Sequence, residues 1–242
     1  MTEAKEPAPE TEPTPIETAR ASLLDAALIH VTFDGWSPAA WKAAVAESGV
    51  DPSLAAEACP RGALDLAVAF HKAGDARMVA DMGDADLEAM RYSERVAFGV
   101  RARLEAATRD REAVRRGATL FSLPHMAPEG SRLIWGTADA IWTTLGDTSN
   151  DLNWYTKRAI LSGVYSSTLL FWLGDDTDGF QATWAFLDRR IDDVMRIEKV
   201  KGQIRKNPIG RAMMDLQDRA FSFVKAPGTG PRTDLPGYSG QP

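Results

Sequence analysis

Apolar side chains recur every third or fourth residue along almost the whole of this sequence, from about residue 18 to residue 225. This spacing places them on one face of an α-helix, whereas a half-buried strand requires strict alternation. We find no alternating segment and no hairpin turn. The pattern therefore predicts an all-α protein, and a chain of 242 residues is long enough to bury a core.

Proline and glycine divide this periodic region into helices. Ser37-Pro38 and Asp51-Pro52 each combine an N-cap residue with proline at the first helical position. The predicted helices span about 19–33, 37–47, 51–58, 61–80, 84–91, 93–107, 110–122, 128–145, 151–172, 180–205 and 207–224.

The two ends of the chain have a different composition. Proline and glutamate fill residues 1–17, and proline and glycine recur in 226–242. Such segments bury too little apolar surface to offset the entropy of ordering, so we predict that both are disordered. Between them we expect a helix-turn-helix-like part (18–80), a larger helical domain (81–206) and an amphipathic helix (207–225). We expect neither a signal peptide nor a membrane-spanning helix.

The helices predicted between residues 37 and 58, with a turn at Gly49, resemble the helix-turn-helix of TetR-type regulators. The third predicted helix would enter the major groove, yet 51–58 contains no Arg or Lys. Over 19–80, seven acidic residues face five basic ones, and the whole chain has a net charge of -6. We therefore predict no nucleic-acid binding. A ligand-responsive transcription regulator of the TetR type is kept as the alternative.

Two predicted helices carry more bulky apolar groups than packing on one side requires, with small residues between them. Such a composition suits an apolar ligand pocket between helices. An ordinary core or a dimer interface explains the same pattern, and the residues alone do not decide. The candidate lining residues are Leu133, Ile134, Ala138, Ile141, Trp142, Leu161, Val164, Thr168, Phe171 and Trp172.

A candidate partner surface lies at the start of the helix predicted over 151–172. Asp151, Trp154, Tyr155 and Arg158 are spaced three and four residues apart, so they share one face. An acid, aromatic rings and an arginine on one exposed face are typical of interface hot spots. In the alternative interpretation Trp154 is a core residue and Asp151 a helix cap. Ile141 and Leu145 complete the candidate partner-binding set.

The helix predicted over 207–224 is amphipathic, and basic residues surround it. It could pack on its own bundle, on a second subunit or on a membrane surface, and the basic cluster favours the membrane. The candidate membrane-binding residues are Ile209, Met213, Leu216, Phe223 and Val224.

The sequence offers little for catalysis. His30, His71 and His125 do not have the spacing of metal ligands, and Cys59 stands alone, which suits a reducing compartment. Residues 175–179 fail as a calcium loop because the first and twelfth positions are not acidic, so they are better interpreted as a turn and helix cap. We predict that the protein is not an enzyme and binds no metal.

Several longer motifs resemble those of the ubiquinone-biosynthesis accessory protein family, the ninth coenzyme Q biosynthesis protein. The resemblance is close over roughly 120–200 and loose over 19–225. It rests on Leu123 to Pro128 (LPHMAP), Asp151 to Arg158 (DLNWYTKR), Tyr165 to Thr168 (YSST) and Thr183 to Ile191 (TWAFLDRRI).

The resemblance implies a TetR-like fold without DNA binding, a bound isoprenoid or phospholipid, and a homodimer. It further implies that the protein presents ubiquinone intermediates to the di-iron demethoxyubiquinone hydroxylase. We therefore expect a lipid-binding accessory protein, peripheral on the cytoplasmic side of an inner membrane or on the matrix side in mitochondria. A purely structural interaction protein without a ligand is a third possibility.

Overall fold

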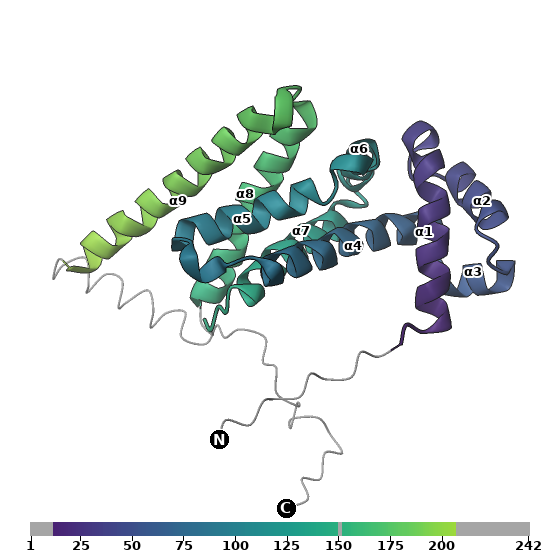
Figure 1. Ribbon diagram of the computed structural model, residues 1–242, viewed down its shortest axis with the longest axis horizontal. Coiled ribbons are helices and arrows are strands. Elements are labelled where there is room, and N and C mark those ends of the chain that lie inside the picture. Colours follow the sequence, from purple (N-terminus) through teal and green to yellow (C-terminus); the bar gives the residue numbers. More distant parts are fainter. Residues whose placement is uncertain (1–11, 150–151, 207–242) are drawn as a thin grey trace, which may run out of the picture. The chain divides into compact units, whose positions relative to one another are not determined.

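A computed structural model describes residues 12–149 and 152–206, with side chains through Arg196. Every regular element in these residues is a helix, which confirms the all-α prediction (Figure 1). Short 3-10 turns occur at Leu87–Ala89, Thr108–Asp110 and Asp178–Phe180. The α-helices are α1 (Pro15–Asp34), α2 (Pro38–Glu47), α3 (Pro52–Ala58), α4 (Ala63–Asp84), α5 (Tyr92–Glu105), α6 (Arg111–Phe121), α7 (Ala127–Thr144), α8 (Leu152–Gly174) and α9 (Gln181–Lys206).

The predicted N-caps of α2 and α3 are present. The Ser37 hydroxyl accepts a hydrogen bond from the amide of Ala40, and the Asp51 carboxylate accepts from the amide of Ser53 at 2.8 Å. These bonds satisfy amides that have no partner in the first turn of a helix. The local sequence therefore fixes where both helices begin.

The expected start of the first helix, near residue 19, is wrong. Helix α1 begins at Pro15, so the last residues of the segment 1–17 that we predicted to be disordered are helical. The reason is a capping box that our interpretation missed. The Thr14 hydroxyl accepts from the Glu17 amide at 3.2 Å, and the Glu17 carboxylate accepts from the Thr14 amide at 2.8 Å.

The helix predicted over 84–91 is also wrong. Helix α4 continues to Asp84, and only the 3-10 turn Leu87–Ala89 follows. The Asp86 carboxylate accepts a hydrogen bond from the Ala89 amide at 3.3 Å. Such a local side-chain bond offers the backbone an alternative to the helix.

The chain forms two compact units. Unit 1 contains the described residues up to Ala85 together with Arg101–Ile134, and unit 2 contains Asp86–Val100 and the described residues from Trp135 onward. One boundary follows the end of α4, and the other two fall inside α5 and α7, so each of these two helices contributes to both units.

The core of unit 1 surrounds α1, which packs against α2, α3, α4 and α6. Leu23 and Val31 of α1 are fully buried. Alanines on α2 and α3 let the helix backbones approach α1 closely. Trp36 closes this core, since its indole packs on Phe70 with ring centroids 5.6 Å apart and donates a hydrogen bond to the carbonyl of Ala113 at 3.1 Å.

A buried polar cluster joins α4 to α5 within unit 1. The Arg103 guanidinium donates to Asp75 Oδ1 at 2.6 Å and to the His71 carbonyl at 3.0 Å. It lies across Gly74, where a Cβ atom would come within 2.6 Å of it. Burial, together with the nearby Arg103 charge, lowers the pKa of His71 to about 4, although Asp75 and a hydrogen bond with the Leu133 backbone act in the opposite direction.

In unit 2, α8 and α9 form a helical hairpin (Figure 1). Asp175 closes it, because its carboxylate accepts from the hydroxyl and amide of Thr177 and of Thr183 at 2.6–2.9 Å. The hydrogen bonds from Thr183 and Thr177 hold the pKa of Asp175 well below its usual value. The interpretation of 175–179 as a turn and helix cap is confirmed.

None of the helices in the described ranges combines the length and apolarity needed to cross a membrane.

Candidate functional site

Unit 2 encloses a cavity of about 260 Å³ between α8, α9, the start of α5 and the end of α7. Tyr92 is about half exposed, so it lies at the mouth of the cavity. Ligand pockets for drug-sized molecules usually enclose ~300–1,000 Å³, so this cavity suits part of a large ligand. Its lining residues are Tyr92, Val96, Trp142, Asn153, Thr156, Lys157, Ile160, Leu161, Val164, Ile191, Val194 and Met195.

The structure brings only some of the candidate lipid-binding residues to this cavity. Trp142, Leu161 and Val164 line it. Four others are buried in the surrounding core without lining it: Ala138, Ile141, Thr168 and Trp172. Phe171 is exposed and stacks on Phe186 with ring centroids 4.6 Å apart. Leu133 and Ile134 belong to unit 1. A lipid-binding role for these residues stays a prediction.

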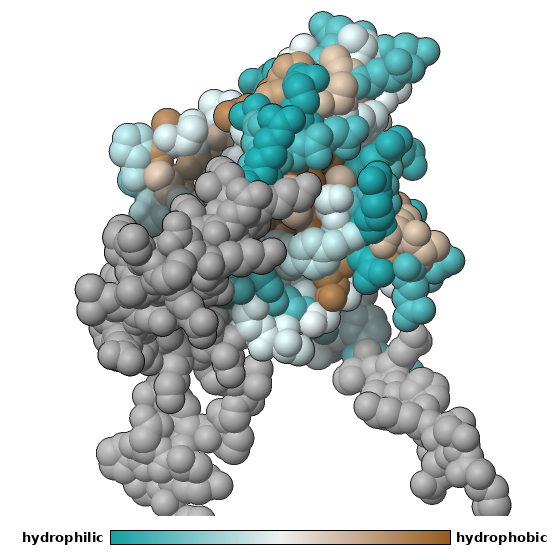
Figure 2. Space-filling view, turned by 90° about the vertical axis from the view of Figure 1, so that its left-hand side faces the viewer, coloured by the Kyte–Doolittle hydropathy of each residue, from teal (hydrophilic) through white to brown (hydrophobic). Residues whose placement is uncertain are grey.

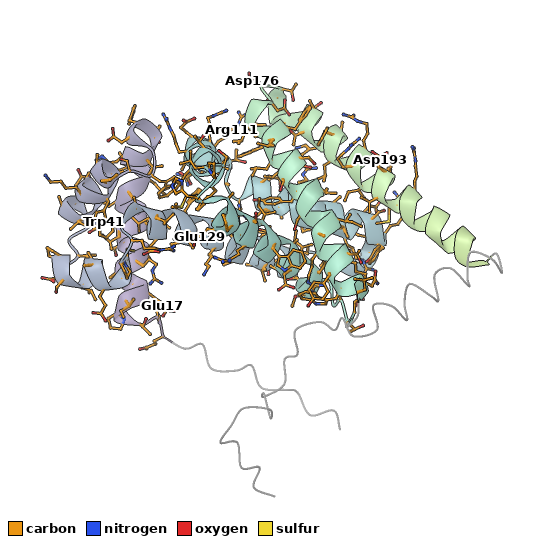
Figure 3. The ribbon with its side chains drawn as sticks, turned by 180° about the vertical axis from the view of Figure 1, so that it is seen from behind. Glu17, Trp41, Arg111, Glu129, Asp176 and Asp193 are labelled. Carbon is orange, nitrogen blue, oxygen red and sulfur yellow. The ribbon has the colours of Figure 1, made fainter. Side chains whose placement is uncertain are left out.

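The sequence did not predict the cavity walls that α5 and α9 contribute. Ile191, Val194 and Met195 recur at helical spacing, but they lie among acidic and basic residues. The charged residues favour a solvated helix face in the sequence, and Asp188, Arg189 and Arg190 are indeed exposed on this helix, on which Figure 3 labels Asp193. On the face that Figure 2 shows, hydrophobic residues likewise appear between hydrophilic ones.

Lys157 forms a polar part of the cavity wall. Its ammonium donates to Asp147 Oδ1 at 2.7 Å and to Ser149 Oγ at 2.9 Å. It also lies 5.4 Å from the centre of the Trp142 ring, whose indole donates to the Lys157 carbonyl at 3.1 Å. The polar wall is therefore held by both α7 and the α7–α8 loop.

Asp147 connects Lys157 to a buried arginine. Its side chain is 4% exposed, and its second oxygen accepts from Arg158 at 3.0 Å. Burial opposes ionisation of this carboxyl, but hydrogen bonds from Lys157, Ser149 and Arg158 outweigh it and lower the pKa of Asp147 to about 2. The carboxylate is thus charged at neutral pH. Arg158 also donates to Asp139 on α7 at 2.5 Å.

Three rings form an aromatic cluster beside Arg158, consisting of Trp135, Trp154 and Tyr155. The Arg158 guanidinium lies 3.9 Å from the centre of the Trp154 ring, which is close enough for a cation–π contact. Trp154 packs edge-on against Tyr155 at 4.8 Å and lies 5.9 Å from Trp135. All three rings are partly buried and therefore retain some exposed surface.

The structure corrects part of the candidate partner surface. Arg158, which we expected on an exposed face, is 2% exposed because Asp139, Asp147 and the Trp154 carbonyl draw its guanidinium inward. Ile141 is fully buried, whereas Leu145 is partly buried. Asp151 lies outside the described residues. The sequence could not reveal these contacts, because Asp139 and Asp147 are distant from Arg158 along the chain.

The five candidate membrane-binding residues lie outside the described residues, so their role stays a prediction. They are Ile209, Met213, Leu216, Phe223 and Val224.

The helix-turn-helix-like part of unit 1 has an acidic second helix. Helix α3 carries no basic side chain, and Asp51 and Glu57 at its two ends are exposed. Trp41 of α2, labelled in Figure 3, packs against Gly62, where an added Cβ atom would lie 3.3 Å from the indole ring. In the described part of the chain, no three His, Cys, Asp or Glu side chains are grouped so as to hold a metal ion.

These features define the class of protein: an all-α TetR-like fold with an acidic helix-turn-helix part and an apolar cavity between its last described helices. The fold is similar to the crystal structure of a TetR transcriptional regulator from Nitrosomonas europaea, with a TM-score of 0.59. That match covers 72% of this chain and 97% of the regulator chain at 18% identity, so it supports a similarity of fold alone.

Residues 127–198 match the model of the COQ9 family, so this chain carries a COQ9-family domain, and the resemblance inferred from its motifs is confirmed. It is 38% identical to the bovine mitochondrial ubiquinone biosynthesis protein COQ9 over 37% of this chain and 28% of that protein. It is 30% identical to the Drosophila melanogaster COQ9 over 78% of this chain and 59% of that protein. The matches thus span less than two thirds of these relatives.

Proposed function

We propose that this protein takes part in ubiquinone biosynthesis as a lipid-binding accessory protein. In this proposal it presents a polyprenylated quinone intermediate to the demethoxyubiquinone hydroxylase at a membrane surface. The observation that carries the proposal is the apolar cavity of unit 2, which lies beside a partly exposed aromatic cluster. The names of the COQ9 relatives support the pathway.

The chemistry of the cavity suits an amphiphile. Its walls are mainly aliphatic and aromatic, and Asn153, Thr156 and Lys157 provide hydrogen-bonding groups along one turn of α8. Apolar walls with a few placed polar groups are typical of small-molecule sites. The Lys157 charge is balanced by Asp147, which favours a neutral ligand such as a quinone.

The aromatic cluster suits a protein partner. Trp and Tyr dominate the binding energy of many interfaces because each buries a large area with little loss of conformational entropy. Here Trp154 and Tyr155 are held in place by Arg158 and by each other. We assign this surface to the hydroxylase.

A second copy of the chain has a separate candidate surface on α8 and α9. Leu170 and Phe171 are exposed at the end of α8, and Phe171 stacks on Phe186 of α9. Adjacent exposed apolar groups favour association. We propose a homodimer through these helices, which sedimentation of Phe171→Glu against the wild type would test. An unchanged dimer in the variant would contradict the assignment.

Native mass spectrometry of the purified full chain tests the lipid site. We expect a co-purified isoprenoid or phospholipid in the wild type. Val164→Phe should remove it, because the larger ring occupies the cavity that Val164 lines. Gly163→Ala is the control, since Gly163 precedes Val164 on α8 but does not line the cavity, and an added Cβ atom there meets nothing within 4 Å. A wild type without lipid, or equal lipid in Val164→Phe, would contradict the proposal.

A pull-down with the hydroxylase tests the partner surface. Trp154→Lys should abolish binding while the helical circular dichroism stays unchanged. Phe33→Lys is the control, because Phe33 is a strongly exposed ring in unit 1. Persistent binding by Trp154→Lys would refute the assignment of the aromatic cluster.

The TetR-like fold keeps a transcription regulator as the second candidate. The acidic surface of α3 argues against it, because phosphate contacts need basic side chains. A salt-dependent gel shift with duplex DNA would favour the regulator.

A further inference from the structure

We propose that Asp147 is a positioning residue that couples occupancy of the cavity to the aromatic cluster. Its carboxylate is shared between Lys157, which lines the cavity, and Arg158, which stacks on Trp154. The inference rests on the proposed function, since it assumes that the cavity binds a ligand and that the cluster binds a partner.

The first step is at the cavity. An ammonium group has three N–H donors. In the described residues the Lys157 ammonium uses two of them, for Asp147 and Ser149. A ligand oxygen inside the cavity can therefore accept the third, and it then competes with Asp147 for the lysine charge.

The second step is inside the α7–α8 loop. Asp147 is 4% exposed, so water does not replace a weakened contact with Lys157. The carboxylate must instead interact more strongly with its other charged partner, Arg158, which donates to its second oxygen at 3.0 Å. Charges interact strongly where water is excluded, so a small movement of Lys157 is felt at Arg158.

The third step is at the surface. Arg158 is bound to both acids through different nitrogens of its guanidinium, with Nη1 donating to Asp147 and Nε donating to Asp139. Asp139 is 43% exposed, so water can take over that contact when the guanidinium moves toward Asp147. The centre of the Trp154 ring lies 3.9 Å from the guanidinium, and the backbone carbonyl of Trp154 accepts a hydrogen bond from Arg158 at 3.2 Å. A shift of Arg158 therefore moves the ring that we assign to the partner surface.

A purely structural role for Asp147 predicts something different. A structural ion network changes the stability of the fold when it is broken, but it leaves the effect of the ligand on partner affinity unchanged. The coupling ratio is the partner affinity with ligand divided by the partner affinity without it, and a residue that carries the coupling changes this ratio when it is replaced. The partner must in turn alter the ligand affinity by the same factor.

The experiment measures the affinity of the full chain for the hydroxylase with and without a saturating benzoquinone that carries two isoprene units. For the wild type we expect the probe to change the affinity at least about fivefold, the lower end of typical couplings. In Asp147→Asn the two affinities should agree within about twofold. Asp139→Asn is the matched control, because it removes the other carboxylate of Arg158 but keeps the path from Lys157, and it should retain the wild-type ratio.

A second variant covers the case in which Asp147→Asn does not fold. Lys157→Gln removes the charge at the cavity end, where the side chain is partly exposed, and should also bring the ratio of the two affinities to about one. Lys157→Arg keeps the charge and should retain the wild-type ratio. A ratio of one in the wild type, or a ratio that persists in Lys157→Gln, overturns the inference. If the wild type still binds both probe and hydroxylase in that case, the proposed function stands; if it binds neither, the proposed function fails as well.

Discussion

Acidification should destabilise this protein through His71 of α4, whose imidazole lies 3.6 Å from Asp75 Oδ2 and near the buried Arg103 charge. The side chain is only 16% exposed. Burial and Arg103 lower its pKa to about 4, while an unfolded chain has a value of about 6.5. The unfolded state therefore takes up a proton between these two values that the folded state excludes. Stability from this group is complete above pH 6.5 and is lost as the pH falls toward 4.

The size of this effect follows from the two pKa values. A shift of one unit corresponds to about 1.4 kcal/mol. Between pH 7.5 and pH 4.5, linkage through His71 alone should lower the free energy of unfolding by about 2.5 kcal/mol. Carboxylates add their own pH dependence over the same range, so the histidine contribution must be isolated by comparison with a variant.

Urea unfolding at pH 7.5 and pH 4.5 measures the contribution of His71 to the free energy of unfolding. His71→Gln replaces the imidazole with a neutral group that can still donate a hydrogen bond. The wild type should lose about 2.5 kcal/mol more than this variant over that pH range. Equal losses in the two proteins would show that His71 titrates normally and that the buried cluster with Arg103 has been misinterpreted.

Three further changes test the local structure by thermal or urea unfolding. Gly130→Ala should destabilise by about 1–3 kcal/mol because its Cβ would lie 2.8 Å from the Phe121 Cβ. Gly136→Ala on the same helix meets nothing within 4 Å and should instead stabilise by roughly 0.5–1 kcal/mol; the reverse order would refute the packing of α7. Thr14→Ala should cost about 1 kcal/mol through the lost capping box, and an unchanged midpoint would show that α1 starts later. Asp175→Ala should cost about 2 kcal/mol or more by leaving the buried amide and hydroxyl of Thr183 without an acceptor, which intact stability would contradict.

The sequence predicted several features that depend on near neighbours, although the capping box of Thr14 and Glu17 was missed. Ser37 and Asp51 cap the helices they precede, and Asp175 closes the turn between α8 and α9, because each acts within eight residues. Three of the cavity residues were found for a similar reason: Trp142, Leu161 and Val164 lie on strongly apolar helices.

Features that depend on residues far apart in the sequence were not predicted. Arg158 shares a helical face with Trp154, but helical spacing does not reveal that two acids from α7 and its following loop bury the guanidinium. In the same way, Tyr92 reaches the cavity wall from a helix about 50 residues before Trp142, with which its ring packs at 5.9 Å. Pattern arguments along one helix contain no information about such neighbours.

If the cavity of unit 2 binds a polyprenyl lipid, as proposed above, its volume would limit how much of the lipid it can enclose. A space of about 260 Å³ covers the head and the nearest part of the tail at most. Each further methylene drawn from a bilayer into water costs about 0.8 kcal/mol. Within the proposed function, the part of the tail outside the cavity would therefore favour contact with the bilayer, so the head of the lipid would be presented most readily while the protein lies at the membrane.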